Sequence, residues 1–333
     1  MYTKTTATAS PDLTEDTITI NNEESLSDNV RFRKCIEAVR LLASHSTDPE
    51  VLKRSQWKVC ITSDNSFPTK AGLASSASGY ACLVFTLAHV FGMDTTSSMS
   101  ELSALARRGS GSACRSLFGG FVHWKKEGLC VAEQIAPANH WPELRCIVAV
   151  VSSASKSVGS TDGMRRSVET SSFLQHRVNN VLPQRIEQMR QAILDKDFDK
   201  LALATMQDSN QFHAVCLDTY PPIFYLNETS QSIIRLVHLY NQHYGKVKVA
   251  YTFDAGPNAV LITQDSDSCA LANILQQLLS TCTEADFFRG ISPTIAADGI
   301  DRSLIEHLLK QKLRGSVEYV ITCRLGKGPV LVE

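Results

Sequence analysis

Hydrophobic and polar positions alternate with two different periods along the chain, and these periods separate strands from helices. Residues 2–9 and 16–20 alternate with a period of two and are rich in Thr and Ile, which predicts strands. From 28 to 42 the apolar residues recur every three to four positions, as in an amphipathic helix. A strand-like run over 57–63 and an apolar helical run over 77–91 follow. The first part of the chain therefore mixes strands and helices.

The remaining pattern is mostly helical, with strands at intervals. A helical half begins near residue 161. Helices are predicted at 99–107, 173–195, 198–214, 229–243, 268–280 and 303–312, and strands at 120–125, 129–135, 145–151 and 317–323, with two more flanking residues 254–258.

Composition narrows the class of protein. The 333 residues are 43% hydrophobic and 20% charged, which is typical of a globular protein with a large core. Lys plus Arg (33) nearly balances Asp plus Glu (34), so the total charge gives no sign of a nucleic-acid-binding protein. No apolar run reaches the roughly 18 residues of a membrane-spanning helix. The ten cysteines have no C-x-x-C pair or zinc spacing, which favours a reducing, cytoplasmic compartment.

The stretch from Phe67 to Gly79 follows the strand-like run over 57–63 and leads into the helical run over 77–91, so the order is strand, small-residue loop, helix start. In that arrangement the backbone N–H groups and the helix dipole can hold a phosphate. The loop is not the G-x-x-x-x-G-K-[ST] motif, because its lysine precedes the glycine. An ordinary capped helix start remains the alternative.

A second loop, residues 107–120, is denser in special residues than a connector requires. The hydroxyls of Ser110 and Ser112 and the guanidinium of Arg115 can converge on a carboxylate or phosphate, because the planar guanidinium binds two oxygens at once. A flexible glycine–serine loop is the alternative. Arg31, in the first turn of the helix over 28–42, is a surface charge on the sequence pattern alone.

A third candidate is Asp254, which ends an apolar strand and begins the turn Asp-Ala-Gly-Pro-Asn. A single carboxylate held in this way is a candidate general base, although an aspartate that only opens a turn is common. His213 is a candidate ligand or base, and a histidine packed on a helix face is the favoured interpretation.

Four motifs taken together resemble diphosphomevalonate decarboxylases, a family of the GHMP kinase superfamily. They are the segment 65–81 with its Lys-Ala-Gly-Leu-Ala-Ser-Ser core, the segment 107–120, Asp-Ser-Asn-Gln-Phe-His-Ala at 208–214, and Tyr-Thr-Phe-Asp-Ala-Gly-Pro-Asn-Ala at 251–259. The resemblance extends over essentially the whole chain.

The resemblance implies an enzyme that decarboxylates (R)-5-diphosphomevalonate with ATP and Mg²⁺, giving isopentenyl diphosphate, ADP, phosphate and CO2 in isoprenoid and sterol biosynthesis. It implies Asp254 as the base and Arg115 as the group that binds the carboxylate. The other implied substrate contacts are Arg31, Ser110, Gly111, Ser112, Ala113, Cys114 and Thr161, and the implied ATP-binding residues are Gly72, Leu73, Ala74, Ser75 and Ser76. Mg²⁺ is expected to arrive with ATP, without a direct side-chain ligand.

The implied fold is α+β, of the two-domain GHMP kinase type. Residues 1–160 would form a mixed α/β sandwich domain that binds ATP, and residues 161–333 would place helices on an antiparallel sheet. The family's Asn-Ile-Ala-x-x-Lys-Tyr-Trp-Gly-Lys-type segment has no counterpart in this sequence, so the first strands of the domain are expected to be missing. A cytoplasmic homodimer without nucleic-acid or membrane partners is expected.

Two other functions remain open on the sequence. One is a small-molecule kinase of the same superfamily, which would stop at a phosphorylated product. The other is a catalytically impaired shortened form that binds a nucleotide or a partner. Formation of ADP without CO2 would indicate the first, and nucleotide binding without turnover the second.

Overall fold

The computed structural model divides into two compact units. Residues 1–24, 30–69, 71–125, 132–154, 156–280, 284–291 and 301–332 are described. The first unit comprises Met1–Thr69, Ala74–His140 and Gly326–Glu333, and the second comprises Lys70–Leu73 and Trp141–Leu325. Helices and sheets occur in both units, as expected for the α+β class. The domain boundary placed at residue 160 from the sequence stays a prediction.

The first unit is built on a four-stranded sheet in the order β1-β4-β2-β3. Strand β1 (Thr3–Ser10) pairs antiparallel with β4 (Lys58–Asn65), and β2 (Thr17–Ile20) runs parallel to β4. The short β3 (Glu23–Glu24) pairs with β2. The strands predicted at 2–9, 16–20 and 57–63 are therefore confirmed.

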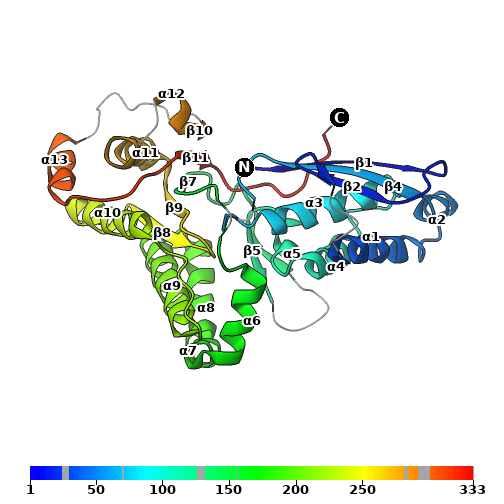
Figure 1. Cartoon of the computed structure of the whole chain (residues 1–333), viewed down its shortest axis with the longest axis horizontal. Helices are drawn as coiled ribbons and strands as arrows, with labels where there is room; N and C mark the ends of the chain where they lie inside the picture. The colour runs from blue at the N-terminus through cyan, green and yellow to red at the C-terminus, as the bar shows by residue number, and fades with distance from the viewer. Residues whose placement is uncertain are drawn as a thin grey trace. The chain divides into compact units, whose positions relative to one another are not determined.

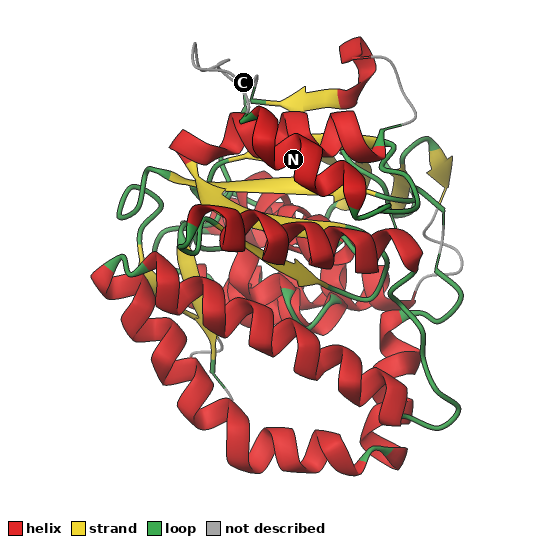
Figure 2. Cartoon of the chain, turned by 90° about the vertical axis from the view of Figure 1, so that its left-hand side faces the viewer, coloured by secondary structure: helices red, strands yellow, loops and turns green. Residues whose placement is uncertain are grey.

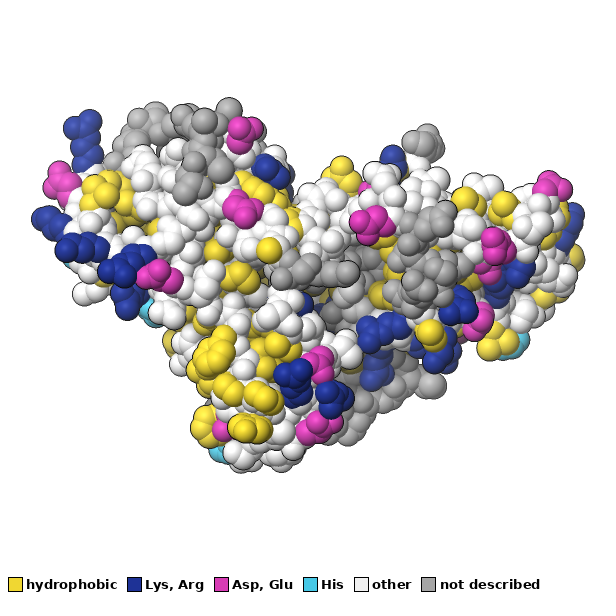
Figure 3. Space-filling model, viewed as in Figure 1, with side chains coloured by type: hydrophobic (Ala, Val, Ile, Leu, Met, Phe, Trp, Pro, Cys, Tyr) yellow, Lys and Arg dark blue, Asp and Glu magenta, His cyan; other side chains and the backbone are white. Residues whose placement is uncertain are grey.

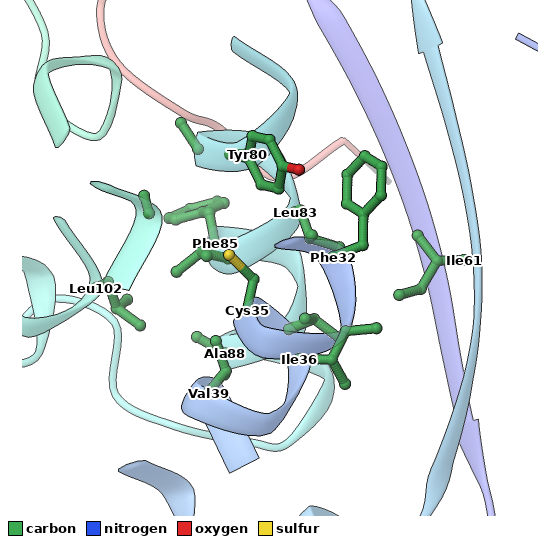
Figure 4. Packing of buried hydrophobic residues seen from close by; sticks show 14 of the residues in the cluster. Phe32, Cys35, Ile36, Val39, Ile61, Tyr80, Leu83, Phe85, Ala88 and Leu102 are labelled. Carbon is green, nitrogen blue, oxygen red and sulfur yellow. The ribbon is translucent and has the colours of Figure 1, made fainter. Parts of the chain in front are cut away.

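Helices cover one face of this sheet (Figure 1). They are α1 (Val30–Ala43), α3 (Ser75–Val90) and α4 (Met99–Gly109), all predicted, while α2 (Pro49–Ser55) was missed. Their apolar stripes form one core, in which the rings of Phe32 and Tyr80 stack with centroids 4.8 Å apart and Ile61 of β4 faces them (Figure 4).

A two-stranded sheet completes the first unit. Strands β5 (Phe121–Trp124) and β6 (Ala132–Ala136) pair antiparallel, and the short helix α5 (Ala113–Ser116) precedes them. Residues 129–131 of the predicted hairpin lie outside the described residues. The Gly120 N–H bonds to the Gly326 carbonyl at 2.8 Å, which attaches the last residues of the chain to this unit.

The second unit contains a five-stranded sheet in the order β10-β11-β7-β9-β8. Its strands are β7 (Leu144–Val150), β8 (Val249–Phe253), β9 (Ala259–Gln264), β10 (Phe288–Gly290) and β11 (Tyr319–Cys323). All neighbouring strands pair antiparallel except β10 and β11, which are parallel. The predicted strands at 145–151, at 317–323 and on both sides of the turn at 254–258 are confirmed.

Helices make up most of the second unit (Figure 2). They are α6 (Ser160–Thr170), α7 (Ser172–His176), α8 (Leu182–Asp195), α9 (Phe198–Asp218), α10 (Glu228–Tyr244), α11 (Asp265–Leu279), α12 (Glu284–Phe287) and α13 (Arg302–Lys310). The helix predicted as continuous over 173–195 is interrupted by a π-helical turn, Arg177–Val181. Pro183, which has no N–H to bond the preceding turn, follows this interruption. Within the described ranges, no helix combines the length and apolarity needed to cross a bilayer.

Asp16 fastens the start of β2 to neighbouring elements. Its carboxylate accepts two hydrogen bonds from Arg40, at 2.5 and 2.6 Å, and one from the Val59 N–H at 2.9 Å. Burial alone would raise the pKa of Asp16, but the bonds from Arg40 and Val59, with the Arg40 charge, hold it below its ordinary value.

We therefore expect Asp16→Asn to lower the free energy of unfolding at pH 7 by about 1–3 kcal/mol. The stabilising contribution of the carboxylate is present above its unfolded-state pKa of about 4 and is lost as the pH falls through the lowered folded-state pKa. Urea denaturation of both proteins at pH 7 and at successively lower pH measures the difference, which should shrink in acid. Equal stability of the two proteins at pH 7 would contradict this role.

Candidate active site

The predicted phosphate loop makes a left-handed turn into helix α3. Gly72 has φ +78° and Ala74, the N-cap residue, has φ +55°. In the part of the chain that the structure describes, no side chain caps this helix start. A helix N-terminus without a side-chain cap presents backbone N–H groups and the positive end of the dipole, so the loop fits a phosphate group.

The second loop lies beside the start of α3 within the first unit. Helix α4 ends at Gly109, Ser110 is extended, and Ser112 is the N-cap residue of α5. The hydroxyls of Ser76 and Ser110 are 3.1 Å apart, so a hydrogen bond joins the two loops. The structure thus brings together two hydroxyls that are 34 residues apart in the sequence.

Trp124 of β5 contacts two arginines of the second loop, a contact that was not predicted from the sequence. Its ring lies under the guanidinium groups of Arg107 and Arg115, whose central carbons are 5.3 and 5.8 Å from the ring centroid. A Cβ at Gly111 would lie 2.9 Å from the Trp124 ring, so the close approach depends on glycine. The cation–π contacts orient Arg115 without neutralising it. No spacing in the sequence indicates this contact.

Some of the predicted contact residues have buried side chains. Leu73, Ala113 and Cys114 are no more than 8% exposed, so any contact they make with a ligand comes from the backbone. Burial raises the pKa of the Cys114 thiol, which donates to the Gly111 carbonyl at 3.2 Å. By contrast, Arg31 in the first turn of α1 is exposed.

The second unit carries the candidate base. Asp254 follows β8 directly and is exposed, although the strand before it is buried. One carboxylate oxygen accepts the Ala255 N–H at 2.7 Å, and the Asp254 carbonyl accepts the Gly256 N–H at 2.8 Å. These bonds form the tight turn predicted from the sequence and hold the carboxylate at the strand end.

Lys156 is a cation on which the charge of Asp254 acts, and the sequence did not single it out. Burial lowers the pKa of its ammonium group, and the Asp254 charge opposes that change. Its Nζ donates to the Ser160 hydroxyl at 2.7 Å, next to Thr161, which is exposed in the first turn of α6. A cation at a helix N-terminus is unfavourable by itself, so this arrangement favours an anion at the same place. A lysine four residues before the helix start was the available signal.

His213 of α9 packs against the end of the strand that leads to Asp254. Its ring is 7% exposed, and burial lowers its pKa to about 4, so it is neutral at pH 7. The ring lies edge-on to Phe253, the residue before Asp254, with centroids 6.2 Å apart. The expectation that His213 is a packed histidine is confirmed.

The fold is α+β of the GHMP kinase type, with helices and mixed sheets in both units. Residues 1–134 match the model of the diphosphomevalonate decarboxylase-like N-terminal domain, and residues 146–332 match that of the mevalonate 5-diphosphate decarboxylase C-terminal domain. The chain belongs to the diphosphomevalonate decarboxylase family, an ATP-dependent family of carboxy-lyases.

Individual relatives agree with this assignment. The chain is 46% identical over 343 residues to human diphosphomevalonate decarboxylase and 45% identical over 345 residues to the rat protein, covering 100% of this chain and 84% of each relative. The X-ray structure of a mevalonate 5-diphosphate decarboxylase superposes with a TM-score of 0.81 at 41% identity, over 98% of this chain and 85% of that one. The enzyme from Trypanosoma brucei gives 0.80 at 34% identity with the same coverage.

A further relative has been solved in complex with MVAPP, AMPPCP and magnesium. It superposes with a TM-score of 0.73 at 30% identity, over 98% of this chain and 85% of that one. The α+β class and the enzyme class expected from the sequence are confirmed.

Proposed function

We propose that this chain converts (R)-5-diphosphomevalonate and ATP into isopentenyl diphosphate, ADP, phosphate and CO2. The observation that carries the proposal is the exposed carboxylate of Asp254, held at the end of a buried strand in a chain of this family. A β-hydroxy acid loses CO2 slowly because hydroxide is a poor leaving group. Phosphorylation converts the hydroxyl into a good leaving group. The protein must therefore first help the hydroxyl to attack the phosphoryl group of ATP.

Asp254 accepts the proton of the tertiary hydroxyl as it attacks the phosphoryl group. Arg115 binds the carboxylate of the substrate through its two-pronged guanidinium and keeps it aligned for C–C cleavage. When phosphate leaves, positive charge develops on the tertiary carbon, and the electrons of the breaking C–C bond form the alkene as CO2 departs. The orientation of Arg115 by Trp124 fits this role.

ATP fits the loop from Gly72 to Ser76. Gly72 has a positive φ and no side chain, and the start of α3 directs its dipole toward an anion. The side chains of Ser75 and Ser76 add hydroxyls at the same helix start. ATP with Mg²⁺ supplies the phosphoryl group and partial neutralisation of its charge. In the described residues, no group of three His, Cys, Asp or Glu side chains forms a metal site of its own.

The remaining predicted residues bind the substrate. Ser110 and Ser112 offer hydroxyls beside Arg115, and the residues from Gly111 to Cys114 lie at the start of α5, where the Ala113 N–H already bonds to the Ser110 carbonyl at 2.9 Å. Arg31 supplies a further positive charge. In the second unit, Lys156 and Thr161 are suited to a phosphate oxygen, because Thr161 lies in the first turn of α6 and the Lys156 ammonium group bonds to Ser160 at its start.

A coupled assay with the purified chain tests the proposal. ADP and CO2 should form in a one-to-one ratio from (R)-5-diphosphomevalonate and ATP. ADP formed without CO2 would replace the proposal with a kinase function. ATP binding with no formation of either product would instead indicate a catalytically impaired form.

A cytoplasmic homodimer is part of the proposal. The eight cysteines whose state the structure describes are free thiols, which suits a reducing compartment. Val168, Phe173, Leu217 and Tyr220, which lie in or next to α6, α7 and α9, are 55–76% exposed, and apolar side chains gather on one face of the second unit (Figure 3). A second copy covering this surface would remove it from water.

Sedimentation equilibrium tests the homodimer. The parent protein should have twice the mass of one chain, and the Leu217→Asp variant should have the mass of a single chain. A parent protein with the mass of a single chain would contradict the homodimer.

A further inference from the structure

The side chain of Asn258 is a buried hydrogen-bonding centre. It is 1% exposed. Its oxygen accepts from the Val151 N–H at 2.7 Å and the Ser152 N–H at 3.0 Å, and its nitrogen donates to the Ala71 carbonyl at 2.8 Å and the Ser152 carbonyl at 3.0 Å. A carboxamide has two acceptor sites and two N–H donors, so all four are used.

These four bonds connect three segments that are far apart in the sequence. Asn258 closes the turn that begins at Asp254, and its partner Ala71 lies 187 residues earlier, immediately before Gly72. Val151 and Ser152 follow β7 on the path to Lys156 and α6. One amide therefore joins the turn of the base, the start of the phosphate loop and the segment that leads to the half-buried lysine.

Backbone contacts at the same place show how closely these segments are fitted. A Cβ at Gly72 would lie 3.0 Å from the Ala255 carbonyl oxygen, and a Cβ at Gly256 would lie 2.9 Å from the Ala71 carbonyl oxygen. The two glycine backbones thus lie against each other with no room for a side chain. Asn258 supplies the directional bonds that fix one backbone relative to the other, since van der Waals contact alone has little directionality.

We propose that Asn258 is a positioning residue for the reaction, setting the distance between the Asp254 turn and the Gly72 end of the phosphate loop. The proposal rests on the function assigned above to Asp254 and Gly72. Its bonds lie outside the ladder of the sheet, because β9 begins at the next residue, Ala259. The bonds of Asn258 therefore order the segments that carry the reacting groups. The reaction rate falls when such groups are not held in the right geometry.

The substitution Asn258→Asp tests this role, because it changes one NH2 group into an oxygen. An ionised carboxylate would face the carbonyls of Ala71 and Ser152 and repel them, whereas a protonated carboxyl group can still donate one hydrogen bond. We expect kcat to fall at least about tenfold at pH 7.5 and the KM for ATP to rise. Activity relative to the parent should recover as the pH falls, because protonation restores one donor.

Asn241→Asp is the matched control. Asn241 also bonds backbone groups at a strand end, accepting from the N–H groups of Lys248 and Val249 and donating to the Val249 carbonyl, but at the start of β8 rather than at its Asp254 end. It should lower the thermal midpoint while leaving kcat and both KM values unchanged. If N258D matches N241D in kcat, KM and pH profile, Asn258 has only a structural role and the proposal is wrong.

Two further measurements keep the result decisive. If N258D does not fold, Asn258→Ser takes its place, because serine retains one donor and one acceptor. A rise in the KM for ATP in this variant supports the proposal, and an unchanged KM for ATP overturns it. The parent protein is assayed first for ADP and CO2. Inactivity of the parent refutes the proposed function, whereas an active parent with parent-like N258D kinetics refutes only the positioning role.

Discussion

Replacing Asp254 by asparagine is expected to lower the rate of formation of both ADP and CO2 about a thousandfold, which corresponds to about 4 kcal/mol in the activation barrier. Asparagine has nearly the same shape, and its amide oxygen can still accept the Ala255 N–H that closes the turn. It cannot take a proton from the tertiary hydroxyl. The fold and ATP affinity should therefore persist while kcat is lost, as measured by a coupled assay and nucleotide titration.

Asp64→Asn serves as the control for this experiment. Asp64 is an exposed carboxylate in β4 of the first unit, so its loss tests the effect of one negative charge without touching the Asp254 turn. The control should retain parental kcat. Turnover by Asp254→Asn at the parental rate would exclude Asp254 as the base and require another proton acceptor.

The second large effect is expected at Arg115. In Arg115→Lys the positive charge remains, but the planar fork that binds two carboxylate oxygens is lost. We expect kcat/KM for the diphosphate substrate to fall about a hundredfold, or about 2.7 kcal/mol, and the KM for ATP to change much less. Steady-state kinetics with each substrate varied in turn measures the two effects. Equal increases in both KM values would contradict a role confined to the carboxylate.

Trp124→Leu examines the orientation of the same arginine. Loss of the cation–π contact should lower kcat/KM for the diphosphate substrate about five- to tenfold, in the direction of Arg115→Lys but by less. Trp57→Leu is the matched control, because Trp57 makes a similar contact with Lys53, 5.9 Å from its ring centroid, outside the candidate site. The control should change stability without changing kcat/KM.

Much of the secondary structure follows from local periodicity. The helices α1, α3, α9 and α10 and the strands β1, β4 and β7 lie within a few residues of their predicted bounds, because their apolar positions recur at one period over a long run. The short elements are different. Helix α2 has only seven residues, and its cap by Asp48 and its Pro49 start were not recognised. The break between α7 and α8 was missed because both halves keep a helical pattern.

Only some residues of the candidate site could likewise be recognised from their neighbours in the sequence. Asp254 and the two small-residue loops stand out locally, since a carboxylate before Gly-Pro and serines between glycines are unusual in a chain otherwise patterned for burial. Trp124, Lys156 and Asn258 were not recognised. Each acquires its position through partners elsewhere in the chain, such as the Ala71 carbonyl 187 residues from Asn258.

The sequence by itself determined the α+β class, most of its helices and strands, and the family, because periodicity and short motifs are properties of neighbouring residues. Tertiary structure alone decided which distant residues touch. Gly72 lies against Gly256, the Trp124 ring lies under the Arg115 guanidinium, and the Gly120 N–H bonds to the Gly326 carbonyl. The physical reason is that such contacts depend on how whole elements pack. No local preference of the residues involved encodes the partner that packing will bring to them.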